Sequence, residues 1–176
     1  MRVMGVDPGI EGAIAVVERG RVIKHARMPV KPGPAGRKKV DGQILLDIMR
    51  SMAEDGLDKA IVENPSAMPK QGVSSSFAFG RSCGIAEMAV IALGVPYDLI
   101  SPSHWKRVMR VPADKGASRA RATELMPKDR SLWARPAGEC FAEAAMIGLW
   151  GLGELSADVI EAGQGVIGLF DDVEVA

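Results

Sequence analysis

The sequence predicts an α/β domain in which a five-stranded mixed sheet is flanked by helices. Three apolar segments near the N-terminus, over residues 2–7, 12–19 and 21–29, have the composition of strands and are separated only by turns. Two further short strands are predicted at 59–63 and 97–100, each after a helix-like segment. Three consecutive strands followed by alternating helices and strands indicate a single mixed sheet.

The first half of the chain carries recognisable turn and capping residues. Gly20 suits a tight hairpin between the second and third strands. Residues 31–40 are rich in Pro, Gly and Lys and predict a loop. Asp41 is a good N-cap for a helix over 42–54, in which the apolar residues recur at helical spacing, and Gly56 ends that helix.

The second half of the chain alternates loops and helices around the last two strands. The predicted segments are a loop over 64–73 and helices over 75–93, 103–109, 115–125 and 137–152. Residues 153–176 contain six acidic side chains and no Lys or Arg. They predict an acidic C-terminal tail after a folded domain of residues 1–152.

Composition narrows the class of protein. The 176 residues fit one domain, and with 47% apolar but only 5% aromatic residues the core is expected to consist largely of aliphatic side chains. No apolar run is long enough to span a bilayer, and the N-terminus reads as a strand without a signal peptide before it. Cys83 and Cys140 lack metal-finger spacing and are expected to be reduced and buried, which favours a cytoplasmic setting.

The charge is unevenly distributed although its sum is zero. Without the tail, 22 basic residues stand against 16 acidic ones, a net charge of +6, and the stretch 103–135 has nine Lys or Arg against three Asp or Glu. A basic stretch next to an acidic tail is typical of a protein with a polyanionic partner. A solvated helix face explains the basic stretch equally well.

Acidic residues occupy positions that suit a metal site. Asp7 ends the first strand and Glu63 the fourth, so parallel pairing of these strands brings both carboxylates to one edge of the sheet. Glu139 and Glu143 are four residues apart on the last helix and share one face. Glu143 lies in an apolar stretch, where an unpaired charge is costly to bury.

Such carboxylates are the ligands that Mg²⁺ prefers, and two ions roughly 3.5–4 Å apart can stabilise both the attacking and the leaving oxygen of phosphodiester cleavage. His25 and His104 are the only histidines and lack ligand spacing, which argues against a zinc hydrolase. Simpler roles stay open for each acid. Asp7 could cap the turn at Pro8-Gly9, Glu63 could be an exposed strand end, Glu143 could pair with an arginine, and Glu139 could be a favourable charge at a helix N-terminus.

Several motifs in order along the chain carry a resemblance to a known family. The segments are GVDPGIEGAIA, IVENP, SFAFGRSCGIAEMA, the pair Lys106 and Lys115, and FAEAAMIG. Over residues 2–150 they resemble the RuvC-like Holliday junction resolvases, most closely the divergent phage and bacterial branch. The resemblance implies a ribonuclease H-like fold, a homodimer, and Mg²⁺- or Mn²⁺-dependent resolution of four-way DNA junctions by symmetric nicks, with two ions in each active site.

The resemblance also implies roles for particular residues. Asp7, Glu63 and Glu143 match three metal ligands of the family. The family often has a further acid three residues before the last of these, where this chain has Cys140, so Glu139 is the nearest substitute as a fourth catalytic ligand. Lys106 and Lys115 match basic residues that face the scissile backbone, with Lys115 assisting catalysis. The predicted DNA-binding patch also includes arginines, namely Arg107, Arg110, Arg119 and Arg121.

Two departures from the family pattern affect the interpretation. Some resolvases have an aromatic wedge shortly after the second acid, whereas here Met68 is the available apolar wedge. Phe77 and Phe79 could serve as the wedge if the loop is long, but helix packing is their expected role. Gly80 and Gly84 are spaced to allow close helix approach, either within the monomer or at a dimer interface. The tail segment 164–170 has a weak likeness to sliding-clamp-binding peptides.

Rival functions remain at this point. They are a broader branched-DNA or flap endonuclease, a non-catalytic junction-binding protein, and an ATP-binding relative of the sugar-kinase and actin-like domains. The chain is short for the paired domains of the last class.

Overall fold

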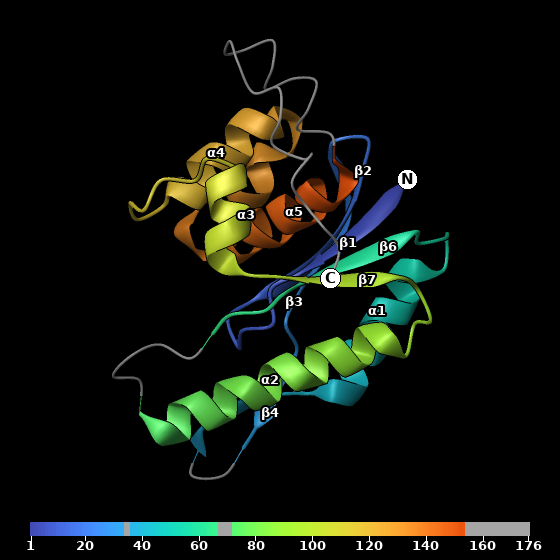
Figure 1. The fold of residues 1–176 in the computed structure, drawn as a ribbon, viewed down its shortest axis with the longest axis vertical. Coiled ribbons are helices and arrows are strands. Elements are labelled where there is room, and N and C mark those ends of the chain that lie inside the picture. Colours follow the sequence, from blue (N-terminus) through green and yellow to red (C-terminus); the bar gives the residue numbers. More distant parts are fainter. Residues whose placement is uncertain (34–35, 67–71, 154–176) are drawn as a thin grey trace.

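The computed structural model describes residues 1–33, 36–66 and 72–153. The main sheet has five strands in the order β3-β2-β1-β6-β7 (Figure 1). The strands are β1 (Arg2–Val6), β2 (Ala13–Glu18), β3 (Arg21–Arg27), β6 (Lys59–Glu63) and β7 (Tyr97–Ile100). β2 is antiparallel to both β1 and β3, whereas β1, β6 and β7 are parallel, which confirms the predicted mixed sheet.

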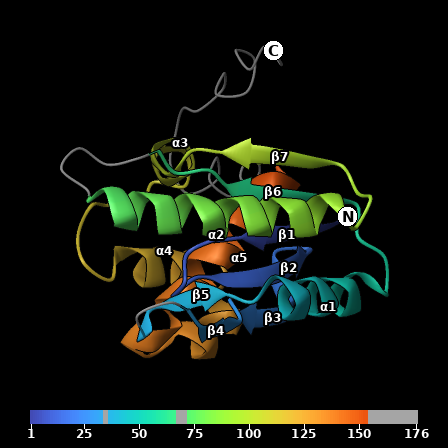
Figure 2. The same ribbon diagram turned by 90° about the horizontal axis from the view of Figure 1, so that it is seen from below.

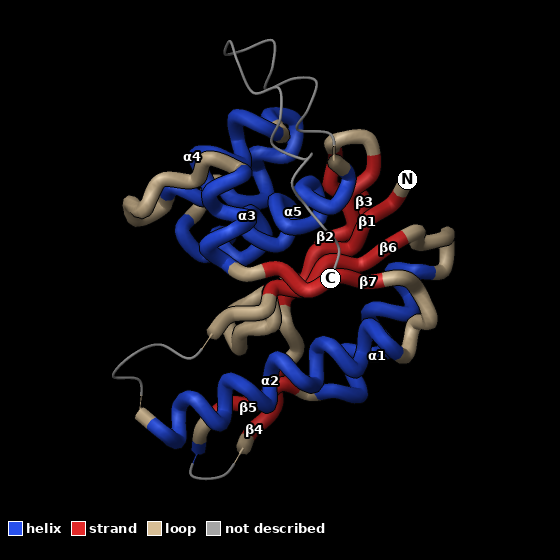
Figure 3. The backbone as a smooth tube through the Cα atoms, in the orientation of Figure 1, coloured by secondary structure: helices blue, strands red, loops and turns tan. Residues whose placement is uncertain are grey.

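Helices cover both faces of this sheet, as the single layer of red strands between blue helices in Figure 3 shows. One face carries α3 (Pro102–Val108), α4 (Ala117–Leu125) and α5 (Glu139–Leu152), and the other carries α1 (Gly42–Ala53) and α2 (Val73–Ile91) (Figure 1). Each predicted helix is present with bounds shifted by up to two residues. Two short 3-10 helices, η2 (Pro127–Trp133) and η3 (Pro136–Gly138), lie between α4 and α5 and were not predicted.

The alternation of side chains along the strands builds two cores. Val3 of β1 faces the α5 side, where it joins Ile61, Trp105 and Met146 in one buried cluster. Met4 and Val6 face the α1–α2 side and join a second cluster that contains Leu45. Because successive residues of a strand point to opposite faces, a nearly continuous apolar strand is what a sheet covered on both sides requires.

Helix α5 packs unusually close to β1 because glycines remove the side chains between them. A Cβ atom on Gly5 would lie 2.1 Å from the carbonyl oxygen of Ala144 and 2.4 Å from the backbone nitrogen of Gly148. Gly5 therefore has no room for a side chain, and a Cβ on Gly148 would also be tight, at 3.0 Å from Val17 Cγ2 and 3.3 Å from the backbone nitrogen of Gly5. This close approach places the first two turns of α5, including Glu143, beside the C-terminal end of β1.

The predicted turn and cap residues are confirmed. Arg19 and Gly20 both have positive φ angles, of 50° and 66°, as a two-residue hairpin turn requires. The Asp41 side chain accepts a hydrogen bond from the backbone N–H of Ile44 and caps α1. Of the two cysteines, which are both free, Cys140 is buried and Cys83 is only half-buried.

The prediction of a loop over residues 31–40 is wrong. The segment forms a second, two-stranded sheet in which β4 (Val30–Pro32) pairs antiparallel with β5 (Lys38–Val40). Its root is held by apolar contacts, since Val40 and the preceding Met28 are buried in the α1–α2 core. Pro32 ends β4, and Gly33 and Gly36 lie between the two strands.

Some predictions lie outside the described residues. These are the acidic tail from residue 154 onward, with the weakly clamp-like segment 164–170, and the wedge residue Met68. In the part of the chain that the structure does describe, no helix is long and apolar enough to cross a membrane.

Candidate metal centre

The site is built around Asp7, which follows the last residue of β1. The parallel register pairs Val6 with Val62, so Asp7 and Glu63 leave neighbouring strands at the same edge of the sheet. The turn after Asp7 is closed by a bond from its N–H to the carbonyl of Ala13 (2.9 Å). Asp7 Oδ1 accepts the N–H of Gly9 at 3.1 Å, so the capping role is confirmed for one oxygen of this carboxylate.

Glu63 is held by an indole ring from the neighbouring helix. Trp105 Nε1 on α3 donates to Glu63 Oε1 over 2.7 Å, and the Trp105 side chain is fully buried. The alternative that Glu63 is an exposed strand end is wrong, because the residue is half-buried and hydrogen-bonded. Trp105 therefore combines a buried packing position with a donor function toward Glu63, which nothing local in the sequence indicates.

Glu143 comes to the site from α5 and has two partners. Lys106 Nζ lies 2.9 Å from Glu143 Oε1, and Ser118 Oγ donates to the same oxygen at 2.8 Å. The alternative that Glu143 pairs with an arginine is wrong, since its cationic partner is Lys106. Nothing in the sequence distinguishes Ser118, which sits at the start of α4, from any other helix-terminal serine.

The three carboxylates act on one another electrostatically. Burial raises the pKa of Asp7 to about 6, with a further increase from the charge of Glu143. Burial likewise raises the pKa of Glu63 to about 7, and the charges of Asp7 and Glu143 add to the shift although the Trp105 hydrogen bond opposes it. The pKa of Lys106 is also raised: burial opposes the charged form, but the bond to Glu143 and the charges of Glu63 and Asp7 outweigh it.

This donor set fits a hard divalent cation. Asp7, Glu63 and Glu143 come from the ends of β1 and β6 and from α5, and the charge of Glu143 raises the pKa of both Asp7 and Glu63, while the Lys106 ammonium bonds to Glu143. As they stand, no three His, Cys, Asp or Glu side chains within the described ranges lie close enough to form a ready-made metal-binding group. The ligand assignments of Asp7, Glu63 and Glu143 therefore stay predictions.

Glu139 is not brought into this group. It is the first residue of α5 and is half-exposed, and its charge is not among those that shift the pKa of Asp7, Glu63 or Lys106. At the neighbouring position, burial raises the pKa of the Cys140 thiol and the charge of Asp7 adds to the shift, and the thiol accepts a hydrogen bond from Arg27 Nη1 at 3.3 Å. The role of Glu139 as a fourth ligand has no geometric support beyond its helix face.

The predicted basic patch divides into two parts. Arg107 and Arg110 are exposed, and Lys115 and Arg110 line a pocket of about 330 Å³ between the end of α3 and the start of α4. Arg119 folds back over Gly116, while its Nε atom is buried without a hydrogen-bond partner. Arg121 has a structural role instead, since its Nε donates to the Met109 carbonyl at 2.7 Å and locks α4 onto α3.

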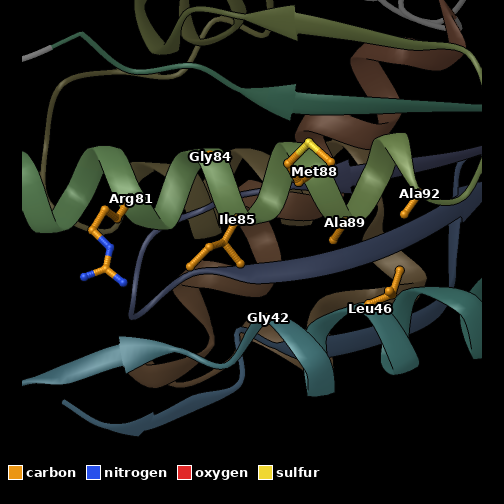
Figure 4. Close-up of a pocket in the computed structure, with 8 residues that line it drawn as sticks. All are labelled: Gly42, Leu46, Arg81, Gly84, Ile85, Met88, Ala89 and Ala92. Carbon is orange, nitrogen blue, oxygen red and sulfur yellow. The ribbon is translucent and has the colours of Figure 1, made fainter.

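A separate apolar surface lies along α2. Gly80 and Gly84 have open space where a Cβ would be, so the interpretation that they permit close packing within the monomer is wrong. Phe77 is 69% exposed, and the expectation that it packs within the protomer is also wrong. Beside these residues of α2, a pocket of about 470 Å³ lies between α1 and α2 and is lined mainly by apolar side chains that include Ile85 and Met88 (Figure 4).

The strand order, the parallel pairing of β1 with β6 and the carboxylates at their ends define a ribonuclease H-like fold. Among solved structures, the chain is similar to RuvC from Thermus thermophilus in complex with a Holliday junction substrate, with a TM-score of 0.59 and 21% identity, over 85% of this chain and 91% of that one. A second Thermus thermophilus RuvC structure matches with a TM-score of 0.54 and 15% identity, over 88% and 97% of the two chains. The predicted RuvC-like fold is thereby confirmed. No protein-family model and no curated protein sequence matches the chain.

Proposed function

We propose that this protein is a metal-dependent, structure-specific DNA endonuclease that resolves four-way junctions by paired symmetric nicks. The observation that supports the proposal is that Asp7 and Glu63 follow neighbouring parallel strands at the same end of the sheet, while the charge of Glu143, which is bonded to Lys106, raises the pKa of both. Burial of three like charges is costly for folding and is typical of sites that bind a cation. A structural neighbour was solved with a Holliday junction, which supports branched DNA as the substrate.

The carboxylates would hold Mg²⁺ or Mn²⁺, with two ions in each active site and Glu139 as a possible fourth ligand. When bound, such ions activate water and stabilise the departing 3′ oxygen of a phosphodiester. Trp105 and Ser118 fix the orientations of Glu63 and Glu143 by donating one hydrogen bond to each. Lys106 presents an ammonium to an incoming phosphate, and Lys115 with Arg107, Arg110 and Arg119 extends the positive surface along the DNA.

The decisive experiment is nicking of a synthetic four-way junction by wild type and Asp7→Asn. Wild type is expected to cut two opposed strands in Mg²⁺ and to stop when a chelator is added, and Asp7→Asn is expected to bind the junction without cutting it. Flap, three-way and duplex substrates belong in the same assay. Equal cutting of flaps would replace junction resolution by a broader branched-DNA activity, and wild-type binding without cutting in any divalent metal would leave only a junction-binding protein.

The dimer implied by two opposed cuts has a candidate interface on α2. Its exposed residues recur at intervals of three or four along one helix face, with glycines in the middle and large apolar side chains at both ends. The stripe consists of Val73, Phe77, Gly80, Gly84, Met88 and Ile91. Two copies of α2 related by a two-fold axis would cross closely at the glycines and bury the apolar ends.

Replacement of one glycine tests this interface. Gly84→Leu is expected to convert a dimer to a monomer in sedimentation velocity, because the added side chain occupies the crossing point. Gly94→Leu is unsuitable as a control because Gly94 has a φ of 70°, so Ser74→Leu, exposed at the start of α2 and off the stripe, serves instead. A monomeric wild type at micromolar concentration in the presence of junction DNA would refute the dimer.

A further inference from the structure

The β4–β5 hairpin emerges at the same edge of the sheet as the carboxylates. β3 runs parallel to β1, because both are antiparallel to β2, so it ends where β1 ends. The chain that leaves β3 is tied there by the Met28 N–H, which donates to the carbonyl of Gly12 at 2.9 Å. Gly12 belongs to the turn that follows Asp7, so the hairpin starts directly beside the candidate metal centre.

This hairpin is strongly basic. Its two strands and the residue before β5 carry four cations, which are Lys31, Arg37, Lys38 and Lys39. The register places Lys31 directly opposite Lys39, so both side chains are on one face of the ribbon, where like charges destabilise a strand pair. Within the described residues, Arg37 and Lys39 form no ion pair with a carboxylate.

The hairpin is nevertheless firmly rooted. The Asp41 N–H donates to the carbonyl of Pro29 at 2.9 Å, and the Asp41 carboxylate both caps α1 and accepts from Lys31 Nζ at 3.0 Å. Lys31 and the N–H groups of α1 lower the pKa of Asp41, so the carboxylate that neutralises Lys31 stays ionised. Lys38 Nζ lies 3.7 Å from Glu11, which is on the same turn as Asp7. These contacts attach the root of the hairpin next to the site and leave Arg37 and Lys39 without an ion-pair partner among the described residues.

The hairpin and the patch on α3 and α4 flank the carboxylates from two sides. In Figure 1 α3 and α4 lie on one face of the sheet and β4 lies with α2 on the other. Figure 2 shows that the hairpin projects at the same end of the molecule as α3 and α4. A duplex arm seated at the carboxylates would therefore meet positive charge from both faces of the sheet.

We propose that the β4–β5 hairpin is a second DNA-binding element, which contacts backbone phosphates of a duplex arm through Arg37 and Lys39 on the side opposite to the α3–α4 patch. The phosphate groups supply the counter-charge that Arg37 and Lys39 lack within the described residues. Because the hairpin presents exposed strands with long cations and no aromatic side chain, it recognises the backbone and not the base sequence. The inference rests on the proposed function.

The test is the salt dependence of binding to a fluorescent four-way junction in chelator, where no cutting occurs. Arg37→Gln/Lys39→Gln is expected to raise the Kd roughly 3- to 30-fold at 0.15 M salt and to flatten the slope of log K against log salt by about 1 to 2, since each lost phosphate contact contributes about 0.9. The matched control is Arg19→Gln/Arg50→Gln, which removes the same charge from two exposed positions, one in the β2–β3 turn and one in the last turn of α1. Its Kd and slope are expected to match wild type, and thermal melting verifies that both doubles fold.

The outcomes separate the two claims. If wild type binds and cuts the junction but both doubles behave alike, the hairpin inference is refuted and the endonuclease assignment stands. If wild type neither binds nor cuts any branched DNA, the proposed function falls and the hairpin inference falls with it. If the hairpin double loses affinity while the salt slope is unchanged, the contact is not with phosphate and the inference is also refuted.

Discussion

The two ends of the same sheet treat charge in opposite ways. At the end where β1 begins, acids at the surface have cationic partners: the partly exposed Glu18 pairs with Arg2 at 3.1 Å, and the exposed Asp55 pairs with Lys24 at 2.6 Å. The Lys24 bond lowers the pKa of Asp55. At the end where β1 finishes, Asp7 and Glu63 are desolvated beside a third acid, and the pKa of each is raised. The acids at the end where β1 begins are paired with cations at the surface, whereas those at the end where β1 finishes are desolvated and repel one another.

This contrast shows where stability has been given up. A carboxylate whose pKa is raised in the folded state makes folding less favourable once it ionises, whereas a paired surface carboxylate is neutral or mildly favourable. Destabilisation confined to one edge, on three elements distant in sequence, is difficult to explain by packing. The proposed cation site, with the basic elements around it that would contact phosphates, accounts for this pattern.

The largest expected effect comes from neutralising an acid at the end of the sheet where the carboxylates are desolvated. Glu63→Gln keeps an oxygen for the Trp105 indole but removes the negative charge. Junction cutting should therefore fall more than about 100-fold, which exceeds the loss typical of replacing a residue that only hydrogen-bonds to a metal ligand. In chelator at pH 8 the variant should also be more stable than wild type, by at most about 3 kcal/mol, because the pKa of Glu63 in the fold is about 7.

Denaturant melts and nicking rates of the same preparations check both parts. Glu18→Gln at the opposite end is the control, and it should leave cutting unchanged and stability unchanged or slightly lower, since it breaks the pair with Arg2. A Glu63→Gln protein that is less stable than wild type would show that the carboxylate is a structural anchor, and the contrast between the two ends would then fail.

The pH dependence of stability should show the same asymmetry. Asp7 and Glu63 bind protons more tightly in the folded than in the unfolded chain, so their contribution is full below about pH 4 and is lost as the pH rises to about 7. Asp55 has a lowered pKa, so its contribution is lost only as the pH falls below its ordinary value of 3.8. In chelator the melting temperature is therefore expected to decline between pH 4 and pH 7.

Mg²⁺ should reverse this decline. At 100 times its Kd a ligand that binds only the folded state adds about 2.7 kcal/mol, so the melting temperature at pH 8 should rise with Mg²⁺ and the rise should shrink at pH 5, where protons occupy the same oxygens. Calorimetry across pH with and without Mg²⁺ measures both. Asp7→Asn should abolish the shift, and a shift that persists in this variant would place the ion elsewhere.

A smaller effect is expected from the indole that orients Glu63. Trp105→Phe removes the Nε1–H donor, so cutting should fall about 10- to 100-fold and more Mg²⁺ should be needed for half-maximal melting protection. Trp133→Phe is a close match, because Trp133 is also buried and its Nε1 bonds Thr123 at 3.0 Å, away from the carboxylates. If both variants lose similar stability but only Trp105→Phe needs more Mg²⁺, Trp105 has a positioning role. If both variants need the same Mg²⁺ concentration, that role is refuted.

The elements that sequence reasoning located well are those with strong local signals. The strands at 59–63 and 97–100 have the predicted bounds, and Gly20 and Asp41 have the predicted turn and cap roles. The pairing of β1 with β6 followed from the order of strands and helices, and it places Asp7 beside Glu63. These features depend on short-range backbone preferences and on connection length, which a sequence displays directly.

The features that were missed depend on contacts between distant segments. Ser118 reaches Glu143 across 25 positions, and no local pattern marks it as a donor. The Gly5–Gly148 contact that seats α5 on β1 is equally invisible, since either glycine alone suggests only a flexible position. The segment 31–40 is predicted to be a loop because its Pro and Gly residues give a stronger local signal than strands of only three residues. The pairing of β4 with β5 depends instead on tertiary contacts such as the burial of Val40.

The smallest expected effect comes from a substitution at the end of the sheet where β1 and β6 begin. Lys59 forms an ion pair with Asp98, both partly exposed, and such surface pairs contribute about 0–1 kcal/mol. Lys59→Ala should therefore change the free energy of unfolding by less than about 1 kcal/mol and leave both the Mg²⁺-dependent melting shift and the nicking rate at wild-type values. Lys59 and Glu63 are on the same strand, four residues apart at its two ends, so this substitution asks whether the electrostatics of one end reaches the other through β6. If Lys59→Ala changes the nicking rate, charges at one end of the sheet influence the other end, and the contrast between the two ends has no functional meaning.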